Sequence, residues 1–287
     1  MKMKEKVSKK QVFVVRFRAF YPFSKSIMFL FSALFFQYCV EPTEGCLDVK
    51  ATNFDVTASK ECDTKCTCTY PSLIVATDYF SGTSSFNYNT TYVNDLGDSF
   101  RIVSNQLYLS DFQLINDNNQ TFRTIDSVAL TRATDTINVL NNYALIGKSV
   151  GFDFAIGSFN GVGNFTKIKF RVGLDAIAAK VIPSKMPTTH PLSTKTDSMY
   201  ISSQSQYIFN KFVIAKGTNF KDTLRLNITT PTDLEFDKTL TFTEGFNAKI
   251  PLIVNYLAFF SGVNFSADEN QIKLKIVSNT RSVFSIK

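Results

Sequence analysis

The sequence has 287 residues, of which 44% are hydrophobic and 19% are charged, a composition too apolar for a disordered chain. Its net charge is +7, and residues 1–38 account for all of it, since they hold eight bases and one acid while the rest holds 23 of each. Without that segment the protein has no positive field to attract phosphate, so we expect no nucleic-acid partner.

Residues 1–38 are predicted to form a signal peptide. A basic head precedes ten uncharged residues, 27–36, whereas a membrane-spanning helix needs about 20 apolar residues. A basic region, a short apolar region and a polar exit are typical of secretory signals. We therefore expect an exported protein, located at the outer membrane or cell surface or in the periplasm. The surplus positive charge argues against the alternative, a buried N-terminal helix.

Cys39 directly follows the apolar region and resembles the lipidated cysteine of a bacterial lipoprotein signal. The sequence departs from that pattern at Tyr38, where a small residue is expected, and at Phe36, where Leu is usual. Glu41 and Glu44 suit the acidic residues that often follow the anchor in surface lipoproteins of Bacteroidota. The resemblance implies lipidation at Cys39 and membrane contact only through this anchor. A freely secreted protein is the alternative.

The other four cysteines lie within 23 positions, at Cys46, Cys62, Cys66 and Cys68. Four cysteines allow three disulfide pairings, and the sequence does not choose among them. Thiolates at these spacings also suit zinc. Because an exported chain meets an oxidising compartment, we expect disulfides.

The run from Gly45 to Ala58 resembles the "GCxDxxAxNY(D/N)xxA" module of secreted proteins of Bacteroidota. In that module, turn-forming Asp and Asn and a small Ala organise a disulfide-tied loop. The resemblance implies that residues 39–71 are a lipid-anchor and disulfide-rich spacer. A segment this small needs covalent staples to fold.

Apolar and polar residues alternate at short intervals from Ser72 onward, the pattern of half-buried strands. The clearest runs are 168–174, 224–228, 250–256 and 272–276. The run from Leu107 to Leu114 changes phase midway, which suits a β-bulge. Turn-forming clusters occupy 116–119, 161–164 and 268–270, and short helices fit 174–180 and 256–260. We predict a mainly β domain over 72–287, an antiparallel β-sandwich with one or two short helices; a barrel is the alternative.

Motifs of enzyme chemistry are missing from the sequence. It contains no Gly-rich phosphate loop after a strand and no G-x-S-x-G elbow. Its one His leaves little for general-base catalysis, and the pair Asp233 and Glu235 is interpreted as a solvated strand face. We therefore expect no enzymatic activity. A hydrolase is kept only because many envelope β-domains are enzymes.

Several segments, in order along the chain, resemble one family. Residues 163–175 resemble a "GxYxxIxFxIGxD" strand, 107–114 a "(Y)YISNIxL" strand and 283–286 a terminal "MFSIH". Between them lie His190-Pro191-Leu192 and the stretch 199–211. Over residues 72–287 the chain is similar to the MbnP-like domain, a secreted β-domain common in Bacteroidota. The resemblance implies copper binding, since its namesakes accompany methanobactin operons and bind copper.

The chain departs from this family at the residues that matter for copper. The copper-binding members use His together with a Trp that a dihaem peroxidase partner oxidises to kynurenine. Their "MYWxWQSGY" stretch has Trp where this chain has Ile201 and Ser203, and the sequence contains no Trp. The His after the terminal strand is Lys287 here, and 74–79 contains no His. Kynurenine chemistry is therefore excluded.

One softer donor set remains for copper. Imidazole and thioether suit Cu(I), and His190, Met199 and Met186 lie within 14 residues of one another. We predict His190 and Met199 as metal ligands. The competing interpretation places Met199 in the core and His190 in a Pro-flanked loop. The sequence thus supports two functions: a copper-binding envelope protein, or a non-catalytic surface module that has lost metal binding and recognises a partner protein or a glycan.

Overall fold

The structure is a computed structural model that describes residues 41–62, 66–147, 153–194, 199–217 and 219–287. The chain divides into two units, Met1–Thr43 and Glu44–Lys287, and the fold below is that of the second unit. The predicted signal peptide and Cys39 lie outside the described residues. The boundaries 1–38, 39–71 and 72–287 stay predictions. Among the described residues, no helix is both long and apolar enough to span a bilayer.

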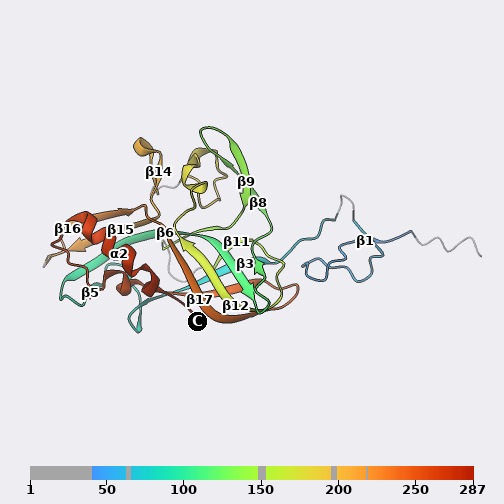
Figure 1. Ribbon diagram of the computed structural model, residues 1–287, viewed down its shortest axis with the longest axis horizontal. Coiled ribbons are helices and arrows are strands. Elements are labelled where there is room, and N and C mark those ends of the chain that lie inside the picture. Colours follow the sequence, from blue (N-terminus) through green and yellow to red (C-terminus); the bar gives the residue numbers. More distant parts are fainter. Residues whose placement is uncertain (1–40, 63–65, 148–152, 195–198, 218) are drawn as a thin grey trace, which may run out of the picture. The chain divides into compact units, whose positions relative to one another are not determined.

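Two sheets make up most of the described fold (Figure 1). The first has the order β16 (Asp222–Ile228), β15 (Asn210–Lys216), β6 (Ser99–Asn116), β12 (Gly163–Val172), β17 (Thr232–Phe242), and β5 (Thr91–Val93), β7 (Thr121–Phe122) and β10 (Tyr143–Ile146) also pair with β6. The second has the order β11 (Asp153–Ser158), β3 (Ser72–Ser81), β18 (Ala248–Asn255), β19 (Phe284–Ile286), with β4 (Ser84–Ser85) beside β3.

Short elements lie outside these two sheets. They are the pairs β1 (Glu44–Gly45) with β2 (Lys60–Glu61), β8 (Ser127–Thr131) with β9 (Thr136–Leu140) and β13 (Tyr200–Ile201) with β14 (Gln206–Tyr207), and the 3-10 helices η1 (Ala178–Lys180), η2 (Pro183–Lys185), η3 (Ser202–Gln204) and η4 (Tyr256–Phe260). The expected short helices at 174–180 and 256–260 correspond to η1 and η4. One α-helix, α2 (Glu269–Val283), is present in the described part of the chain.

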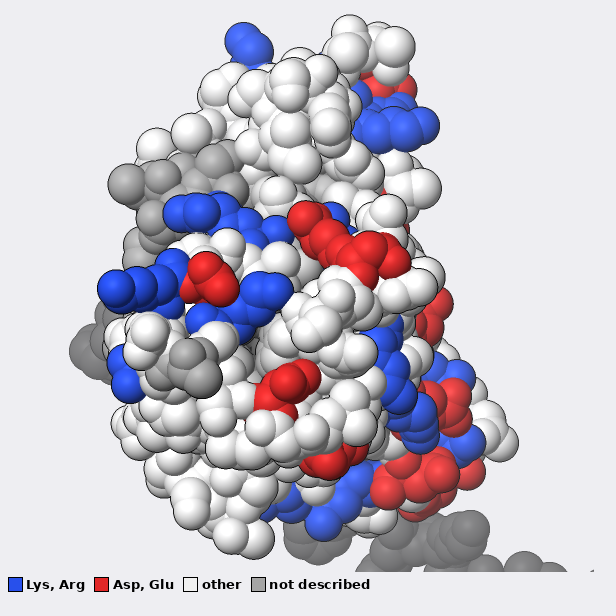
Figure 2. Space-filling model, turned by 90° about the vertical axis from the view of Figure 1, so that its left-hand side faces the viewer, with Lys and Arg blue, Asp and Glu red and all other residues white. Residues whose placement is uncertain are grey.

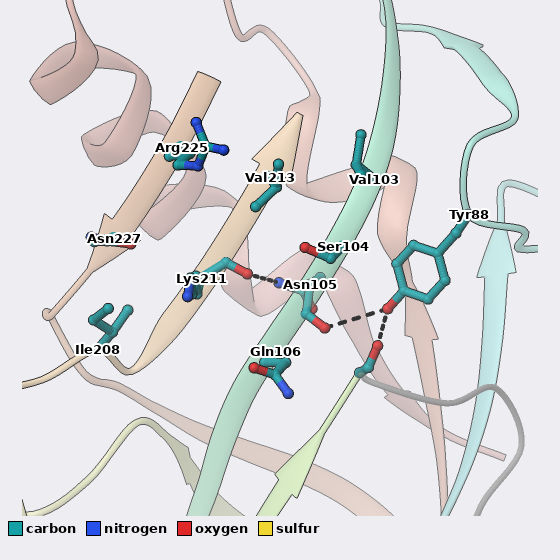
Figure 3. Close-up of a pocket in the computed structure, with 11 residues that line it drawn as sticks. Tyr88, Val103, Ser104, Asn105, Gln106, Ile208, Lys211, Val213, Arg225 and Asn227 are labelled. Carbon is teal, nitrogen blue, oxygen red and sulfur yellow. Dashed lines mark hydrogen bonds between the residues drawn. The ribbon is translucent and has the colours of Figure 1, made fainter. Parts of the chain in front are cut away.

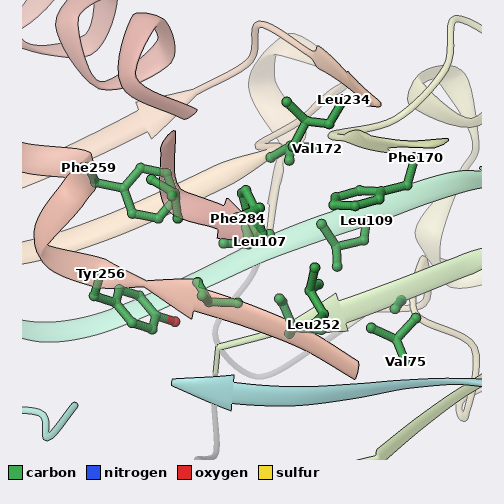
Figure 4. Close-up of a cluster of buried hydrophobic side chains, with 14 of the residues drawn as sticks. Val75, Leu107, Leu109, Phe170, Val172, Leu234, Leu252, Tyr256, Phe259 and Phe284 are labelled. Carbon is green, nitrogen blue, oxygen red and sulfur yellow. The ribbon is translucent and has the colours of Figure 1, made fainter. Parts of the chain in front are cut away.

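The alternating apolar residues of both sheets meet in one buried core. In β18, Ile250, Leu252 and Val254 are fully buried while the residues between them are not. Figure 4 shows Leu252 and Val75 from the second sheet facing Leu109 from the first. The predicted β-sandwich is confirmed. Most strand pairs are antiparallel, but β18 runs parallel to β3. Parallel neighbours cannot be joined by a hairpin and need a long crossover connection, which the chain between β3 and β18 supplies.

The expected bulge lies in β6. Asp111 has a φ of 53°, and the pairing of β6 with β12 shifts between Gln113 and Ser110. Because of this extra residue, Leu109 and Phe112 both face the core although three positions separate them.

The predicted strand at 272–276 is wrong, because this segment lies in α2. Ile272 and Ile276 are buried, whereas Leu274 between them is 69% exposed. The burial therefore follows a helical period of about four rather than a strand period of two. Asp268, expected in a turn, caps the helix by accepting hydrogen bonds from the backbone N–H groups of Asn270 and Gln271.

The four cysteines of the N-terminal segment form two disulfides, Cys46–Cys68 and Cys62–Cys66. The expectation of disulfides is confirmed, and the structure selects this pairing from the three. Asp48 supports the loop, since it accepts a hydrogen bond from the Tyr70 hydroxyl at 2.8 Å. The resemblance of this segment to a Bacteroidota spacer module stays a prediction.

Candidate functional site

His190, the predicted metal ligand, lies in a tight turn after η2. Its backbone N–H donates to the carbonyl oxygen of Pro187, and its own carbonyl accepts from Ser193. The side chain is 8% exposed. The ring lies edge-on to that of Tyr143, with 5.9 Å between the ring centroids.

Both ring nitrogens of His190 have hydrogen-bond partners. Nε2 lies 3.2 Å from the side-chain oxygen of Asn141, and Nδ1 accepts from the backbone N–H of Leu192 at 3.1 Å. An amide oxygen accepts and an N–H donates, so these partners assign the neutral tautomer with its proton on Nε2. The ring of His190 holds its loop against β10 through Tyr143. A metal ion could bind a ring nitrogen only by displacing its hydrogen bond to Asn141 or Leu192.

Met199 and Met186 are buried in a second hydrophobic cluster together with Tyr108, Tyr207 and Leu192. Met199 lines a cavity of about 200 Å³, and His190 is not among the residues lining it. No group of three or more His, Cys, Asp or Glu side chains within the described ranges is arranged to hold a metal ion. Metal binding at His190 and Met199 stays a prediction.

A pocket of about 460 Å³ opens on the outer face of the first sheet (Figure 3). Core residues Phe212, Ile214 and Leu226 point inward from β15 and β16, so their neighbours along each strand point outward into the pocket. The lining residues come from three adjacent strands and three connecting segments: Tyr88, Val103, Ser104, Asn105, Gln106, Gly147, Ile208, Lys211, Val213, Arg225 and Asn227.

Asn105 organises the floor of the pocket. Its amide nitrogen donates to the Asn210 side chain at 2.7 Å and to the carbonyl of Lys211 at 3.0 Å. Its side-chain oxygen accepts from the hydroxyl of Tyr256 at 3.1 Å. The hydrogen bonds of this buried amide all go to protein groups, and those with Asn210 and Lys211 hold β15 against β6.

Tyr88 closes one side of the pocket. Its hydroxyl donates to the carbonyl of Gly147, and lies 3.4 Å from the carbonyl of Asn105 (Figure 3). Burial raises the pKa of the Tyr88 hydroxyl to about 12, so it remains a neutral donor at physiological pH. Gly147 has a φ of 101°, and a Cβ there would lie 2.7 Å from the carbonyl oxygen of Asn105. Only glycine fits at this position.

The opposite wall carries polar side chains that have no hydrogen-bond partner among the described residues. Gln106 is 7% exposed, and its side chain makes no hydrogen bond with any residue that the structure describes. The side-chain oxygen of Asn227 is also buried without a partner among the described residues. Lys211 and Arg225 stand beside these two amides.

Sequence reasoning missed this site. In the sequence, Arg225 and Asn227 are the polar residues between the core positions of the run 224–228, and Lys211 ends the stretch 199–211; neither pattern indicates a pocket. The available signal was the uneven charge: the outward residues of 211–213 and 225–227 include two bases and no acid.

Comparison with known proteins gives one family match and one similar structure. Residues 72–277 match the family model described as MbnP. No curated protein matches the chain. Among solved structures, MbnP from Methylosinus trichosporium is similar at 11% sequence identity and a TM-score of 0.43, covering 66% of this chain and 76% of that one.

Proposed function

The chain belongs to the MbnP family, and from this we propose that it is an exported, non-catalytic binding protein of the cell envelope. Its ligand site is the pocket between β6, β15 and β16. A cavity of about 460 Å³ has the size of small-ligand sites. It suits one end of a glycan better than the broad surface of a partner protein.

The observation that carries this proposal is the side-chain oxygen of Asn227, which is buried without a hydrogen-bond partner among the described residues, in a pocket that Gln106 also lines. Leaving a buried polar group without a hydrogen-bond partner costs about 1–3 kcal/mol. Asn227 and Gln106 both line the pocket, so a ligand that enters it supplies the missing partner of Asn227 and meets the amide of Gln106. The side-chain amide of Asn105, in contrast, already donates to acceptors within the protein, at Asn210 and Lys211.

A glycan array probed with the purified, labelled protein tests this function. The wild type is compared with Gln106→Leu, which removes the amide, and with Gln113→Leu as a matched control on the same strand outside the pocket. We expect a glycan signal that Gln106→Leu loses and Gln113→Leu keeps. An array with no signal, or a signal that Gln106→Leu retains, would overturn the proposal.

Copper binding is the second candidate. It is favoured by the family and by the position of Met186 and Met199, which share a cluster with Tyr143, the residue against the His190 ring. Titration with Cu(I) against a competing chelator compares the wild type with His190→Ala and Met199→Leu. The binding-module proposal expects three indistinguishable curves. Tight binding that is lost in His190→Ala would assign the protein to copper instead.

Export and lipid anchoring complete the proposal. The two disulfides support export, because disulfides form and persist mainly outside the reducing cytosol. We place the lipid at Cys39, as the sequence pattern implies. Labelling cells with a palmitate analogue, with Cys39→Ser as the control, tests the anchor. Equal label in both proteins would exclude it.

A further inference from the structure

We infer that the pocket between β6, β15 and β16 binds two consecutive sugars of a neutral glycan, one at the side-chain amide of Gln106 and the next at that of Asn227. The inference rests on the proposed function and adds to it the class and the length of the ligand, an uncharged chain of at least two linked sugars.

The two amides stand in one row across three strands. Asn227 of β16 pairs directly with Lys211 of β15, and Lys211 pairs directly with Gln106 of β6. Directly paired residues share one face of a sheet, and all three line the pocket. Figure 3 shows them following one another across the strands, with Asn227 at one end of the row and Gln106 at the other.

The separation of the two amides sets the length of the ligand. Neighbouring strands lie about 4.8 Å apart, so two spacings place Asn227 and Gln106 about 10 Å apart. Side chains stand roughly perpendicular to a sheet, so the amides keep about this separation. A single sugar ring is too short to span it, whereas two linked sugars are long enough. The cavity of about 460 Å³ lies within the range of sites for ligands of that size.

Both amides have hydrogen-bonding capacity to offer a ligand. The side-chain oxygen of Asn227 is buried without a partner among the described residues. The Gln106 side chain is 7% exposed and makes no hydrogen bond with them. An amide donates through its nitrogen and accepts through its oxygen, and this matches the hydroxyl groups of a sugar, because each hydroxyl can do both. A ligand that uses the whole row therefore carries hydroxyl groups at both ends.

Apolar side chains border the row on both sides. Val103 and Val213 lie on one side of it and Ile208 lies on the other (Figure 3). Covering apolar surface is favourable in water, and the C–H faces of sugar rings can cover these side chains while their hydroxyl groups meet the amides.

An uncharged chain suits this face of the molecule better than a charged polymer. Outside residues 1–38, the sequence has 23 bases and 23 acids. Figure 2, which faces the side of the molecule where β15 and β16 lie, shows charged side chains of both signs there. This side therefore has no field of a single sign that would attract a charged polymer.

An extended peptide is a poorer occupant of this pocket. A peptide that joins a sheet does so through backbone hydrogen bonds at an open strand edge. β15 offers no such edge at the pocket, because β16 and β6 pair with it along both sides. Recognition in the middle of this sheet therefore depends on side chains, among which the two amides are placed to act.

A chain-length series measured on the intact purified protein by isothermal titration calorimetry tests the inference. The probes are linear homo-oligosaccharides of glucose, galactose, mannose and xylose, from one to four sugars long. We expect at least one series in which the disaccharide binds about 10-fold or more tightly than the monosaccharide, the effect of one further hydrogen-bonded amide. A third or fourth sugar should add less than the second does.

Two variants separate the two sugar positions. Gln106→Leu and Asn227→Leu should each weaken the disaccharide about 10-fold. Only one of them should weaken the monosaccharide, because one ring reaches one amide. Gln113→Leu, on β6 outside the pocket, is the matched control and should leave both affinities unchanged.

The outcomes distinguish this inference from the proposed function. Equal affinity for monosaccharide and disaccharide in every series that binds, or a monosaccharide weakened by both variants, would overturn the two-sugar assignment and leave the proposed binding function intact. No binding in any of the four series would overturn the inference as well. A signal from other glycans on the array would then still support the proposed function, and a silent array would overturn both.

Discussion

The side-chain amide of Asn105 donates a 2.7 Å hydrogen bond to the side-chain oxygen of Asn210, on the neighbouring strand β15. Both side chains are buried, and the bond ties β6 to β15 directly beneath the pocket. Gln106 and Lys211 are the next residues along these two strands. The bond therefore fixes the backbone that presents both of these groups to a ligand, so the pocket is preformed.

Replacing Asn210 with Ala should destabilise the protein, because it leaves a hydrogen of the buried Asn105 amide without this acceptor. We expect the free energy of unfolding to fall by about 1–3 kcal/mol. Urea denaturation followed by circular dichroism measures the change. Asn227→Ala is the matched control: its side-chain oxygen has no hydrogen-bond partner in the described part of the chain, so the same measurement should change by less than about 0.5 kcal/mol. Equal losses in the two variants would contradict this description of the floor.

Gly147→Ala should disrupt the pocket. The φ of 101° is strained for alanine, and the new Cβ would lie 2.7 Å from the Asn105 carbonyl oxygen. Gly163→Ala separates the two effects, since Gly163 has a φ of 94° but no atom within 4 Å of a Cβ. Backbone strain alone costs about 1–3 kcal/mol. We expect thermal unfolding to show a loss of this size for Gly163→Ala and a larger one for Gly147→Ala; a smaller loss for Gly147→Ala would be inconsistent with the close approach.

His190 should carry its proton on Nε2. The assignment follows from the acceptor at Asn141 and the donor at Leu192. Because the sequence has a single His, long-range ¹H–¹⁵N NMR spectra at neutral pH contain one imidazole pattern, which distinguishes the two neutral tautomers directly. A proton on Nδ1 would show that the loop is held differently and would free Nε2 for a metal.

Acid should remove the contribution of Glu235 to stability. Hydrogen bonds from Lys169 and then Lys167 lower the pKa of the Glu235 carboxyl from 4.5 to about 2. A lowered folded-state pKa means that the stabilisation is complete above about pH 4.5 and is lost as the pH falls toward 2. The difference in unfolding free energy between the wild type and Glu235→Gln should therefore shrink over this window.

Glu244→Gln is the control for the pH experiment, since Glu244 is exposed and forms no ion pair with the described residues. Comparison with this variant subtracts the general effect of losing one carboxylate. A Glu235→Gln difference that does not shrink between pH 4.5 and 2 would show that the contacts with Lys167 and Lys169 do not stabilise the fold.

The N-terminal cap of α2 should contribute to stability. Asp268 accepts from two backbone N–H groups, each at 3.0 Å, and Asp268→Ala removes both bonds at a cost of about 1 kcal/mol. Asp268→Ser restores a capping oxygen and should recover most of the loss. Chemical denaturation compares the three proteins, and an unchanged Asp268→Ala would rule out this cap as a stabilising feature.

The error at α2 shows where the sequence misled. Ile272, Leu274 and Ile276 alternate with polar residues. This alternation satisfies a strand pattern, and five residues cover little more than one turn of a helix, too few to show the helical period. The helical signal lay outside the triplet. Asp268 precedes the run as a capping residue, and Thr280 and Val283 continue the buried stripe of Ile272 and Ile276.

The sandwich itself could be predicted because its strands obey local rules. Each core strand alternates apolar and polar residues, and the bulge at Asp111 is visible as a change of phase from Leu109 to Phe112. The pocket could not be predicted in this way. Gln106, Lys211 and Arg225 come from three strands, and only the pairing of β6 with β15 and of β15 with β16 brings them together. Sequence spacing carries no information about such non-local neighbours.

Titration of isotopically labelled protein with a glycan identified on the array, followed by ¹H–¹⁵N correlation spectra, tests the proposed binding site most directly. We expect saturable shifts concentrated at the pocket residues Gln106 and Asn227, with no matching response near His190 or Met199. Shifts centred on the His190 loop, or spectra that the glycan does not change, would contradict the proposed function.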